Sequence, residues 1–427
     1  MTAATAAPGP LAGIRVLDLT RVLAGPYCTM LLADMGAEVI KIEMPGTGDD
    51  SRAFGPMLPA GGGSAYFMSV NRGKKSVTVN LKKPSGQGLV RRLASQCDVL
   101  VENFRPGTMD KYGLSYDALR KINPSLVYAS LSGYGQYGPD SQKPAYDVII
   151  QARSGLLSIT GHPGGDPVKV GASIADITTG MYGAMSILGA LRHRERTGEG
   201  QRIDVAMLDS LVSVLENALV RYTVGGEVPG ALGCRHPSIT PFDMYRATDG
   251  YVVVAIGNQS LWEKFCDLVG KKEWKVDQRF ASNEARTQNV AALQGLLNEL
   301  FGTNSTAHWL SMLTAFGIPC GPVNNVAQVA ADPQLLAREA LLNFAGPTKE
   351  FLTPGTPMKL SRSPLTPATT APRLGEHTEA VLTGLLKLGP REIELLGRDG
   401  VITVPGEVVP QPASKDEAVA AVADAGR

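Results

Sequence analysis

One aspartate stands alone in a long stretch of small and apolar residues. Asp176 lies in VGASIADITTGMYGAMSILGAL, residues 170–191. Met181, Met185 and Leu188 recur downstream at helical spacing, so the stretch is predicted to be a helix with Asp176 near its N-terminus.

Two interpretations of Asp176 follow from that position. An aspartate at a helix start commonly acts as the N-cap, because its side chain accepts hydrogen bonds from free backbone N–H groups. A carboxylate can instead be a nucleophile, since at neutral pH it needs no general base to be ionised. Small neighbours would leave room for a substrate: Gly171, Ala172, Ser173, Ala175 and Gly180. Position alone leaves the two interpretations about equally favoured.

The other residue types that carry catalysis show no familiar spacing. The five histidines and five cysteines are scattered, and the chain has neither a GxSxG elbow nor a P-loop. We therefore expect no metal site and no permanently bound cofactor. His236, in GCRHPSITP, is singled out because it falls in a predicted linker between domains, where ligand clefts form. A structural or solvent-facing histidine is nevertheless the commoner case.

Two charged segments could bind an anionic ligand. MPGTGDDSR, residues 44–52, is a polar glycine-rich loop after a predicted strand, and NRGKKSVTVNLKKP, residues 71–84, carries five basic side chains. Charge runs are usually solvated faces, but loops at the carboxyl ends of parallel strands are also where phosphates bind. Together with Arg105 and Lys111, these groups would suit a phosphorylated ligand.

The predicted elements alternate between strand and helix. GIRVLDL, AGPYCTMLLADMG and AEVIKIE form one strand–helix–strand unit, and the same alternation recurs downstream. This pattern predicts an α/β fold with a parallel sheet covered on both faces by helices. Glu43 ends the second strand where the ribose-binding acid of a nicotinamide site would stand. The first turn, TRVLAGPY, has one glycine where that fingerprint needs three, which disfavours nicotinamide binding.

The length of 427 residues exceeds the size at which single cores stop growing, so we expect two domains, or one elaborated domain with an insertion. Asp249-Gly250 predicts a hairpin at the start of the second domain. The predicted parts are the first part of a large domain at 1–205, a linker helix and loop at 206–230, a smaller α+β domain at 231–327, a return segment completing the large domain at 328–405, and a loose C-terminal tail at 406–427.

Composition argues against several kinds of partner. The 41 Lys and Arg against 40 Asp and Glu give a net charge of +1, which offers no field that would draw the protein to nucleic acid or a membrane. No apolar run reaches about 18 residues, and MTAATAAPGP lacks the layout of a signal peptide. We therefore expect a soluble cytoplasmic protein that acts on small molecules.

Nine segments taken together resemble the class III CoA-transferase family, the relatives of formyl-CoA transferase. The resemblance runs from Leu11 to about Val401, and each motif alone is modest, but nine in family order are specific. The segments are LAGIRVLDLTRVLAGPYCTMLLADMGAEVIKIE, GDDSR, NRGKKSVTVNL, DVLVENFRPGTMDKYGL, YASLSGYGQYGP, AYDVIIQARSGL, GASIADITTG, RHRERTGEGQRIDVAML and GIPCGPVNN.

The resemblance implies a Rossmann-like large domain, a smaller domain, and a homodimer whose two subunits pass through one another as interlocked rings. It makes Asp176 the nucleophile. It also implies CoA contacts on or near Val22, Val79, Leu81, Lys82, Asn103, Phe104, Thr108 and Lys111. One family contact, a basic residue in formyl-CoA transferase, is Met44 here, so the grip on the nucleotide phosphates must differ.

The implied reaction moves CoA from an acyl-CoA to a free acid through an aspartyl anhydride and an aspartyl-CoA thioester. One alternative is a 2-methylacyl-CoA racemase, which shares the fold. Its family pattern has a histidine before the aspartate that is Asp147 here, and this chain has Tyr146 instead, which favours the transferase. A CoA-binding protein without catalysis is a further alternative.

The residues of these motifs are most similar to those of the branch that transfers CoA from succinyl-CoA to dicarboxylic acids such as glutarate. Leu23 replaces a glutamine of formyl-CoA transferase, and GCRHPSITP replaces its glycine-rich lid, which argues against oxalate. A dicarboxylic acid keeps one carboxylate free, so a cation should face it. The candidate substrate contacts are Leu23, Arg52, Arg72, Tyr146, Asp147 and His236.

Overall fold

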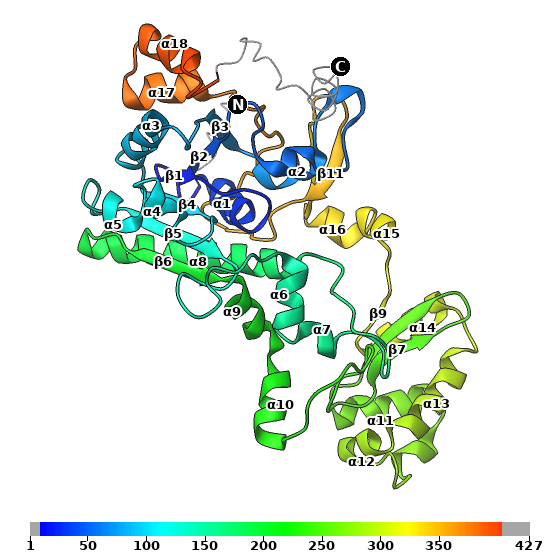
Figure 1. The fold of residues 1–427 in the computed structure, drawn as a ribbon. Helices are drawn as coiled ribbons and strands as arrows, with labels where there is room; N and C mark the ends of the chain where they lie inside the picture. Colours follow the sequence, from blue (N-terminus) through cyan, green and yellow to red (C-terminus); the bar gives the residue numbers. More distant parts are fainter. Residues whose placement is uncertain (1–8, 404–427) are drawn as a thin grey trace, which may run out of the picture. The chain divides into compact units, whose positions relative to one another are not determined.

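The computed structural model describes residues 9–403, so the predicted tail at 406–427 lies outside the described residues (Figure 1). The chain divides into two compact units. The first comprises the residues up to 155, 170–216 and those from 336 on, and the second comprises 156–169 and 217–335. The predicted small domain at 231–327 falls inside the second unit, which begins earlier and also takes in 156–169.

The first unit is built on a parallel sheet of six strands in the order β3-β2-β1-β4-β5-β6. This is the strand order of dinucleotide-binding Rossmann folds, although the glycine fingerprint is missing. The predicted α/β fold with a parallel sheet is therefore confirmed. The strands are β1 Arg15–Asp18, β2 Glu38–Glu43, β3 Lys74–Thr78, β4 Val99–Glu102, β5 Val127–Ser132 and β6 Arg202–Ala206.

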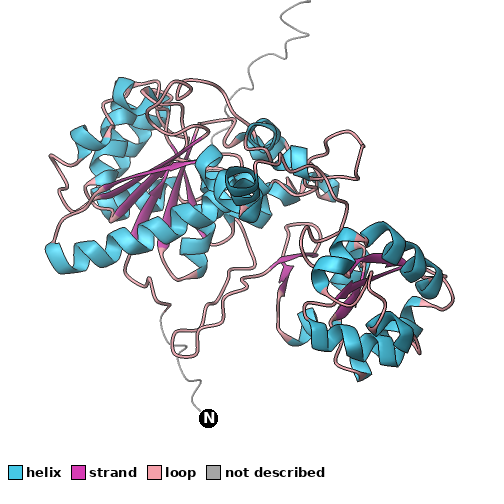
Figure 2. Ribbon diagram, turned by 90° about the horizontal axis from the view of Figure 1, so that it is seen from below, coloured by secondary structure: helices cyan, strands magenta, loops and turns pink. Residues whose placement is uncertain are grey.

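Helices cover both faces of this sheet (Figure 2). One face packs against α3 Pro84–Ala94, α5 Tyr116–Leu119, α17 Thr378–Leu386 and α18 Pro390–Arg398. The other face packs against α1 Ala24–Asp34 and α8 Ile174–Thr197. The strands are rich in Val, Ile and Leu, as expected for a parallel sheet buried on both sides.

Shorter elements of the first unit lie mostly in the loops between these layers. They are η1 Asp50–Ala53, η2 Pro59–Gly61, α2 Ala65–Asn71, α4 Thr108–Lys111, α6 Asp147–Arg153, α9 Met207–Val212 and η3 Ser213–Leu215, together with the antiparallel pair β10 Leu341–Phe344 and β11 Phe351–Pro354. The short helix α16 Pro333–Ala337 spans the boundary at residue 335 between the second unit and the last part of the first.

The linker helix predicted within 206–230 is interrupted. α9 ends at Val212, and Glu216 has a positive φ of 49°, a conformation that breaks a right-handed helix. The 170–216 segment of the first unit ends at this residue, and α10 Asn217–Gly225 belongs to the second unit. The continuous apolar pattern did not reveal this break.

The second unit has its own core, in which three tryptophans pack with phenylalanines. The predicted hairpin is confirmed, because β7 Phe242–Arg246 and β8 Tyr251–Ala255 pair antiparallel across Asp249-Gly250. The remaining elements are α7 Leu156–Ile159, α11 Gln259–Leu268, η4 Lys272–Lys275, α12 Asn283–Gln288, α13 Val290–Phe301, α14 Thr306–Ala315, β9 Cys320–Pro322 and α15 Val326–Ala330.

The small residues of α8 let it approach α1 very closely. A Cβ atom on Gly180 would stand 2.7 Å from the carbonyl oxygen of Ala24 and 2.9 Å from a ring carbon of Tyr27. A Cβ on Gly183 would stand 3.0 Å from Leu131 of β5. α8 is long and apolar enough to suit a membrane span by composition, yet this packing is that of a core helix. Its glycines set the distance between the two helices.

We expect Gly180→Ala to reduce the free energy of unfolding by about 1–3 kcal/mol, the usual effect of overpacking a tight contact. Gly189→Ala is the matched control, because a Cβ there meets no atom within 4 Å. That change should leave stability the same or raise it by up to about 1 kcal/mol, since alanine is the better helix former. Urea unfolding of both variants tests this, and equal effects would contradict the close packing.

Candidate active site

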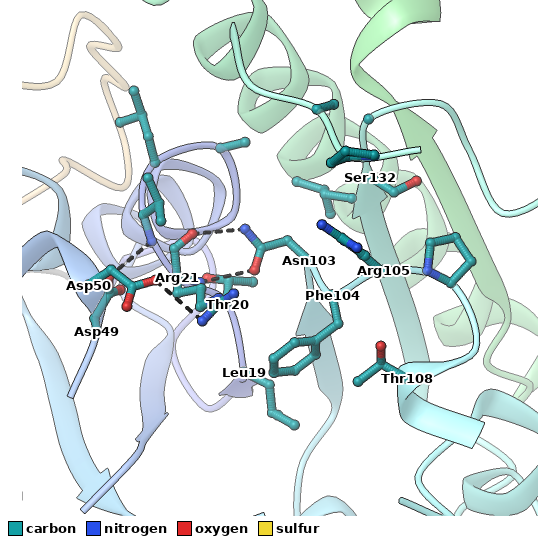
Figure 3. Close-up of a pocket in the computed structure, with 18 of the residues that line it drawn as sticks. Leu19, Thr20, Arg21, Asp49, Asp50, Asn103, Phe104, Arg105, Thr108 and Ser132 are labelled. Atoms are coloured by element: carbon teal, nitrogen blue, oxygen red, sulfur yellow. Dashed lines mark hydrogen bonds and ion pairs between the residues drawn. The ribbon is translucent and has the colours of Figure 1, made fainter. Parts of the chain in front are cut away.

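A cavity of about 590 Å³ opens at the carboxyl end of the sheet (Figure 3). Its walls come from the loops that follow β1, β2, β3, β4 and β5 and from the first turn of α8. In doubly wound sheets, ligands bind where the strand order reverses, which here is between β1 and β4. The cavity is large enough for a small-molecule ligand.

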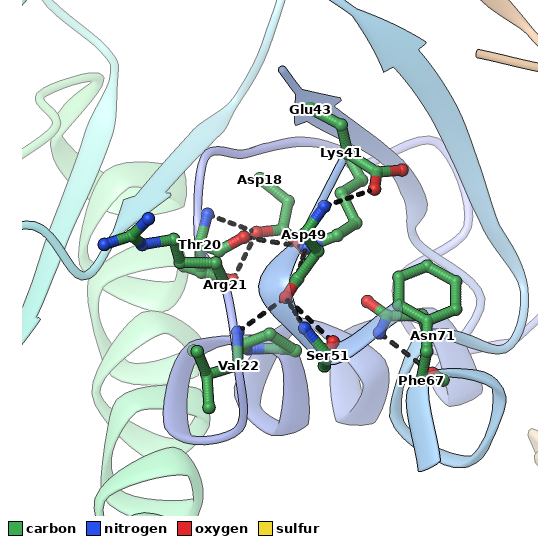
Figure 4. Close-up of polar contacts among 12 residues, drawn as sticks. Asp18, Thr20, Arg21, Val22, Lys41, Glu43, Asp49, Ser51, Phe67 and Asn71 are labelled. Atoms are coloured by element: carbon green, nitrogen blue, oxygen red, sulfur yellow. Dashed lines mark hydrogen bonds and ion pairs between the residues drawn. The ribbon is translucent and has the colours of Figure 1, made fainter. Parts of the chain in front are cut away.

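Buried charges fix the loop between β1 and α1 (Figure 4). Lys41 of β2 donates a 2.7 Å hydrogen bond to the carbonyl oxygen of Thr20 and forms a 2.8 Å ion pair with Asp49. Asp49 accepts a 3.0 Å hydrogen bond from the N–H of Val22. Both partners of the ion pair are buried, and Lys41 lowers the pKa of Asp49 to about 2 despite the opposing effect of burial. The loop is thus held at both ends.

Val22 has a backbone conformation that a β-branched residue seldom adopts. Its φ is +69°, in the left-handed region, where such residues are strained. The hydrogen bond to Asp49 holds it there. Gly25 permits the turn that follows, because a Cβ on it would stand 2.3 Å from the Cβ of Thr20. Strain of this kind concentrates at functional sites, and Val22 lines the cavity.

Asp176 lies in the first turn of α8 and reaches the cavity. The prediction that it might be the N-cap is wrong: Ser173 is the N-cap, and its side chain makes no capping hydrogen bond. The N–H of Ala175 is instead satisfied by Asp147, which accepts it at 2.8 Å from a different helix. The Asp176 carboxylate accepts a backbone hydrogen bond from Ala24, in the first turn of α1.

Burial and then the charge of Asp147 raise the pKa of Asp176 to about 7, against the smaller lowering effect of the Ala24 N–H. At neutral pH the carboxyl group of Asp176 is therefore close to its titration midpoint in the free protein. The helix dipoles at this position favour the anion, but desolvation outweighs them. Functional carboxylates are commonly desolvated by burial, and their pKa is raised toward neutral pH for this reason.

Most of the residues implied as CoA contacts do line the cavity. These are Val22, Val79, Leu81, Lys82, Asn103, Phe104 and Thr108, whereas Lys111, in α4, is not among the lining residues. Asn103 also ties two loops together, since its amide donates to the carbonyl oxygen of Arg21 at 2.8 Å and accepts the Arg21 N–H at 3.0 Å. Met44 lines the cavity as well.

The candidate substrate contacts fall in different places. Leu23 and Tyr146 line the cavity. Asp147 is engaged in holding the start of α8 and in a 2.6 Å hydrogen bond from Gln151. His236 belongs to the second unit, where its Nδ1 accepts the N–H of Ser238 at 3.2 Å and its ring packs against Phe242.

The two candidate arginines are already paired with acids. Arg72 is buried and donates to both oxygens of Asp34, at 3.0 and 2.7 Å. Arg52 donates to both oxygens of Glu43 at 2.7 Å and stacks on Phe67. Neither lines the cavity. Their proposed contact with a free substrate carboxylate is therefore not supported by this geometry.

Several cavity residues were not singled out from the sequence: Arg21, Ser132, Lys143 and Met207. Each stands at the carboxyl end of a strand or in the loop that follows it, which is the position where parallel sheets place ligand contacts. The lysines of NRGKK were candidates for binding an anionic ligand, but Lys74 has a structural role instead. Lys74 is buried against Asp18 at 3.1 Å, and burial lowers its pKa to about 8.

Comparison with known proteins gives a family and several similar relatives. The model of CoA-transferase family III matches residues 11–378. Acetyl-CoA:oxalate CoA-transferase of Acetobacter aceti is 44% identical over 83% of this chain and 90% of its own length. Human succinyl-CoA:glutarate CoA-transferase is 40% identical over 92% of this chain and 90% of its own length.

Among solved structures, a CAIB/BAIF family protein from Brucella suis is 41% identical and superposes with a TM-score of 0.79. The match covers 88% of this chain and all of that one. The family resemblance read from the nine motifs is thereby confirmed. With the Rossmann-type sheet, the cavity at its switch point and a family match over most of its length, this chain belongs to CoA-transferase family III.

Proposed function

We propose that this enzyme moves CoA from an acyl-CoA, with succinyl-CoA as the donor, to a free dicarboxylic acid, and that Asp176 carries the reaction covalently. CoA-transferase activity follows from the family. The donor, the acceptor class and the aspartyl intermediates are the proposal.

The observation that carries the proposal concerns the acids of the cavity, which are Glu43, Asp49, Asp50 and Asp176. Glu43 is paired with Arg52, Asp49 with Lys41, and Asp50 with Arg21 at 3.3 Å. Within residues 9–403, Asp176 forms no ion pair with a basic side chain. It is the cavity carboxylate that is free to attack.

The chemistry balances at every step without an external reactant. The Asp176 carboxylate attacks the donor thioester carbonyl, which gives a mixed anhydride and releases CoA thiolate. The thiolate attacks the aspartyl carbonyl, which gives an aspartyl-CoA thioester and releases the donor acid. The acceptor carboxylate then attacks this thioester, and the freed thiolate attacks the acceptor side of the second anhydride. The product acyl-CoA leaves, and Asp176 is regenerated.

The neighbours of Asp176 suit these steps. Negative charge develops on the aspartyl carbonyl oxygen when the thiolate attacks, and the N–H of Ala24 that already contacts this carboxyl group can stabilise it. The glycine-permitted packing of α8 on α1 brings that N–H within reach. Partial burial around Asp176 limits access of water, which would hydrolyse the anhydride and the thioester.

The proposed acceptor class rests on the acceptor acids for which the relatives are named and on the residues of the motifs. Three relatives are named for glutarate, two for mesaconate and one for oxalate. We favour a dicarboxylic acid longer than oxalate, because the hydrophobic Leu23 lines the cavity. A screen of glutarate, malate, itaconate, oxalate and carnitine with succinyl-CoA would rank them, and a preference for oxalate or carnitine would contradict this choice.

We also propose a homodimer with interlocked subunits, acting in the cytoplasm. The first unit exposes apolar side chains on three helices that pack against one another, α6, α8 and α9. They are Val148, Ile149, Met181, Met185 and Val212, each between 37 and 62% exposed. A face of this kind commonly marks a protein–protein interface.

Asp176→Asn should abolish transfer, with a loss of at least about 10³-fold in kcat, because the amide cannot act as the nucleophile. Hydroxylamine or borohydride added after succinyl-CoA should modify residue 176 in the native enzyme, as read by peptide mass spectrometry. Unchanged turnover in the variant would refute the covalent role, and exchange of an α-proton without transfer would favour the racemase.

The pH profile of kcat/KM should rise with pH and level off above a midpoint near 7, because only the ionised Asp176 attacks and its pKa is about 7. Asp147→Asn should move the midpoint to lower pH, since it removes the nearby charge that raises this pKa while keeping an oxygen for the Ala175 N–H. The raised pKa also means that folding stability contributed at this site falls as pH rises from about 4 to about 7. A flat profile between pH 5 and 8 would contradict the assignment.

Two differently tagged preparations of the protein, mixed without denaturant, should not exchange subunits if the rings are interlocked. Exchange should occur after unfolding and refolding the mixture. Size-exclusion chromatography with light scattering, followed by pull-down through one tag, measures both. A monomeric mass would rule out the dimer, and ready exchange under native conditions would leave a dimer but rule out the interlocking.

A further inference from the structure

A buried carboxyl group lies directly before a loop that carries implied CoA contacts. Glu102 is the last residue of β4 and is 4% exposed. Residues 103–107, which we call the CoA loop, connect it to α4. Asn103 and Phe104 of this loop line the large cavity, where Figure 3 shows both. Glu102 is not among the lining residues of that cavity. It can therefore act on a ligand there through the CoA loop rather than by contact.

A hydrogen bond from Phe104 to Glu102 orients the start of the CoA loop. The N–H of Phe104 donates to Oε2 of Glu102 at 2.8 Å. Asn103 is fixed separately, because its side chain is hydrogen-bonded to the backbone of Arg21. The ring of Phe104 packs against the apolar core on one face of the sheet. The carboxyl group of Glu102 therefore sets the direction of the backbone where the chain leaves the sheet and enters the cavity wall.

The carboxyl group of Glu102 has no cation bound to it. Within residues 9–403 it forms no ion pair, and its other hydrogen bond is with Ser130 of β5. Burial raises the pKa of Glu102 to about 7, against the lowering effects of Ser130, the Phe104 N–H and Arg202. The charged and titratable groups that face it from the surrounding elements are Arg105 of the CoA loop, Asp110 of α4, Asp117 of α5, Tyr128 of β5, and Arg202 and Asp204 of β6.

A smaller cavity gives water access to this buried group. It has a volume of about 50 Å³, and the CoA loop forms part of its wall. Glu102 and Ser130 line it, as does Gln136, whose buried Nε2 has no hydrogen-bond partner among the described residues. A polar space of this size accommodates a water molecule. Because the exposed residues Arg105 and Asp110 border the same space, protons can pass between solvent and Glu102.

We propose that Glu102 is a positioning residue for CoA: its ionised carboxylate holds the Phe104 backbone in the orientation that binds CoA thioesters, and its protonation weakens that binding. The reason is that a hydrogen bond to an ionised acceptor is about twice as strong as one between neutral groups. The inference rests on the proposed function for the place of CoA in the large cavity. It adds a pH dependence of CoA binding that is separate from the ionisation of Asp176.

The test measures the dissociation constant of S-ethyl-CoA, a thioether that cannot acylate the protein, by calorimetry at about pH 5.5 and about pH 8.5. Every protein in the series carries Asp176→Asn, which removes the titration of Asp176. Adding Glu102→Gln should leave binding unchanged at the lower pH and weaken it by about fivefold at the higher pH, because the amide keeps a neutral acceptor but cannot ionise. Adding Glu102→Ala should weaken binding at both, since the Phe104 N–H then has no acceptor.

Asp110→Asn in the same background is the matched control. It removes a negative charge from the same small cavity, and among the described residues the Asp110 side chain makes no hydrogen bond to the CoA loop. The ratio of the two dissociation constants should therefore stay that of the parent. This ratio includes the titration of the CoA phosphate, which is common to all variants. The inference is overturned if Glu102→Gln keeps the parent's ratio, or if Asp110→Asn changes it as much.

Proton release gives a second readout that a purely structural role would not change. If binding favours the ionised form of Glu102, it must release protons near pH 7, by linkage. Calorimetry in buffers of different ionisation enthalpy should therefore find more protons released by the parent than by Glu102→Gln. Equal release would contradict the inference.

The outcomes also separate this inference from the proposed function. Failure of the wild-type chain and of Asp176→Asn to bind S-ethyl-CoA at either pH would refute the function and this inference with it. Binding that is insensitive to Glu102→Gln, with transfer activity intact in the wild type, would leave the function standing and refute the positioning role alone. Thermal unfolding at both pH values confirms that weaker binding does not come from misfolding.

Discussion

The close contact between α1 and α8 is the constraint on which the site depends. Gly180 lets the two helices approach until the first turn of α1 reaches the first turn of α8. The N–H of Ala24 then meets the carboxyl group of Asp176. A larger residue at this contact would separate the helices and remove the donor from the carboxyl group. The many small residues around Asp176 therefore serve the packing of two helices as well as the space for a substrate.

A second constraint acts on the loop that leads into α1. Lys41 and Asp49 are both buried, and together they hold Thr20 and Val22. Removing one partner of such a pair leaves an uncompensated buried charge, which typically destabilises a protein by about 3–5 kcal/mol. The pair maintains the strained conformation of Val22 and with it the direction of the chain into α1. Lys41 of β2 and Asp49 of the glycine-rich segment at 44–52 therefore have a structural role, although that segment looks like a ligand-binding motif in the sequence.

The sequence was sufficient for the sheet and for the position of the nucleophile candidate. The predicted strands GIRVLDL and AEVIKIE contain β1 and β2, because parallel strands buried on both faces are rich in apolar residues. It was not sufficient for partners brought together by the fold. Nothing near Arg72 in the sequence indicates that Asp34, 38 residues away, would pair with it. The capping of α8 by Asp147 and the break at Glu216 are likewise set by tertiary contacts and backbone geometry, which local patterns do not encode.

The pKa of Asp176 illustrates the same limit, because burial and a carboxylate on another helix determine it. Its covalent role is the central claim, and oxygen transfer tests that role most directly. If the acceptor carboxylate attacks an aspartyl-CoA thioester, one acceptor oxygen remains on Asp176 when the product leaves. After turnover with succinyl-CoA and ¹⁸O-labelled glutarate, the peptide containing Asp176 should therefore gain the label by mass spectrometry. Formation of glutaryl-CoA with no label in that peptide would contradict the mechanism.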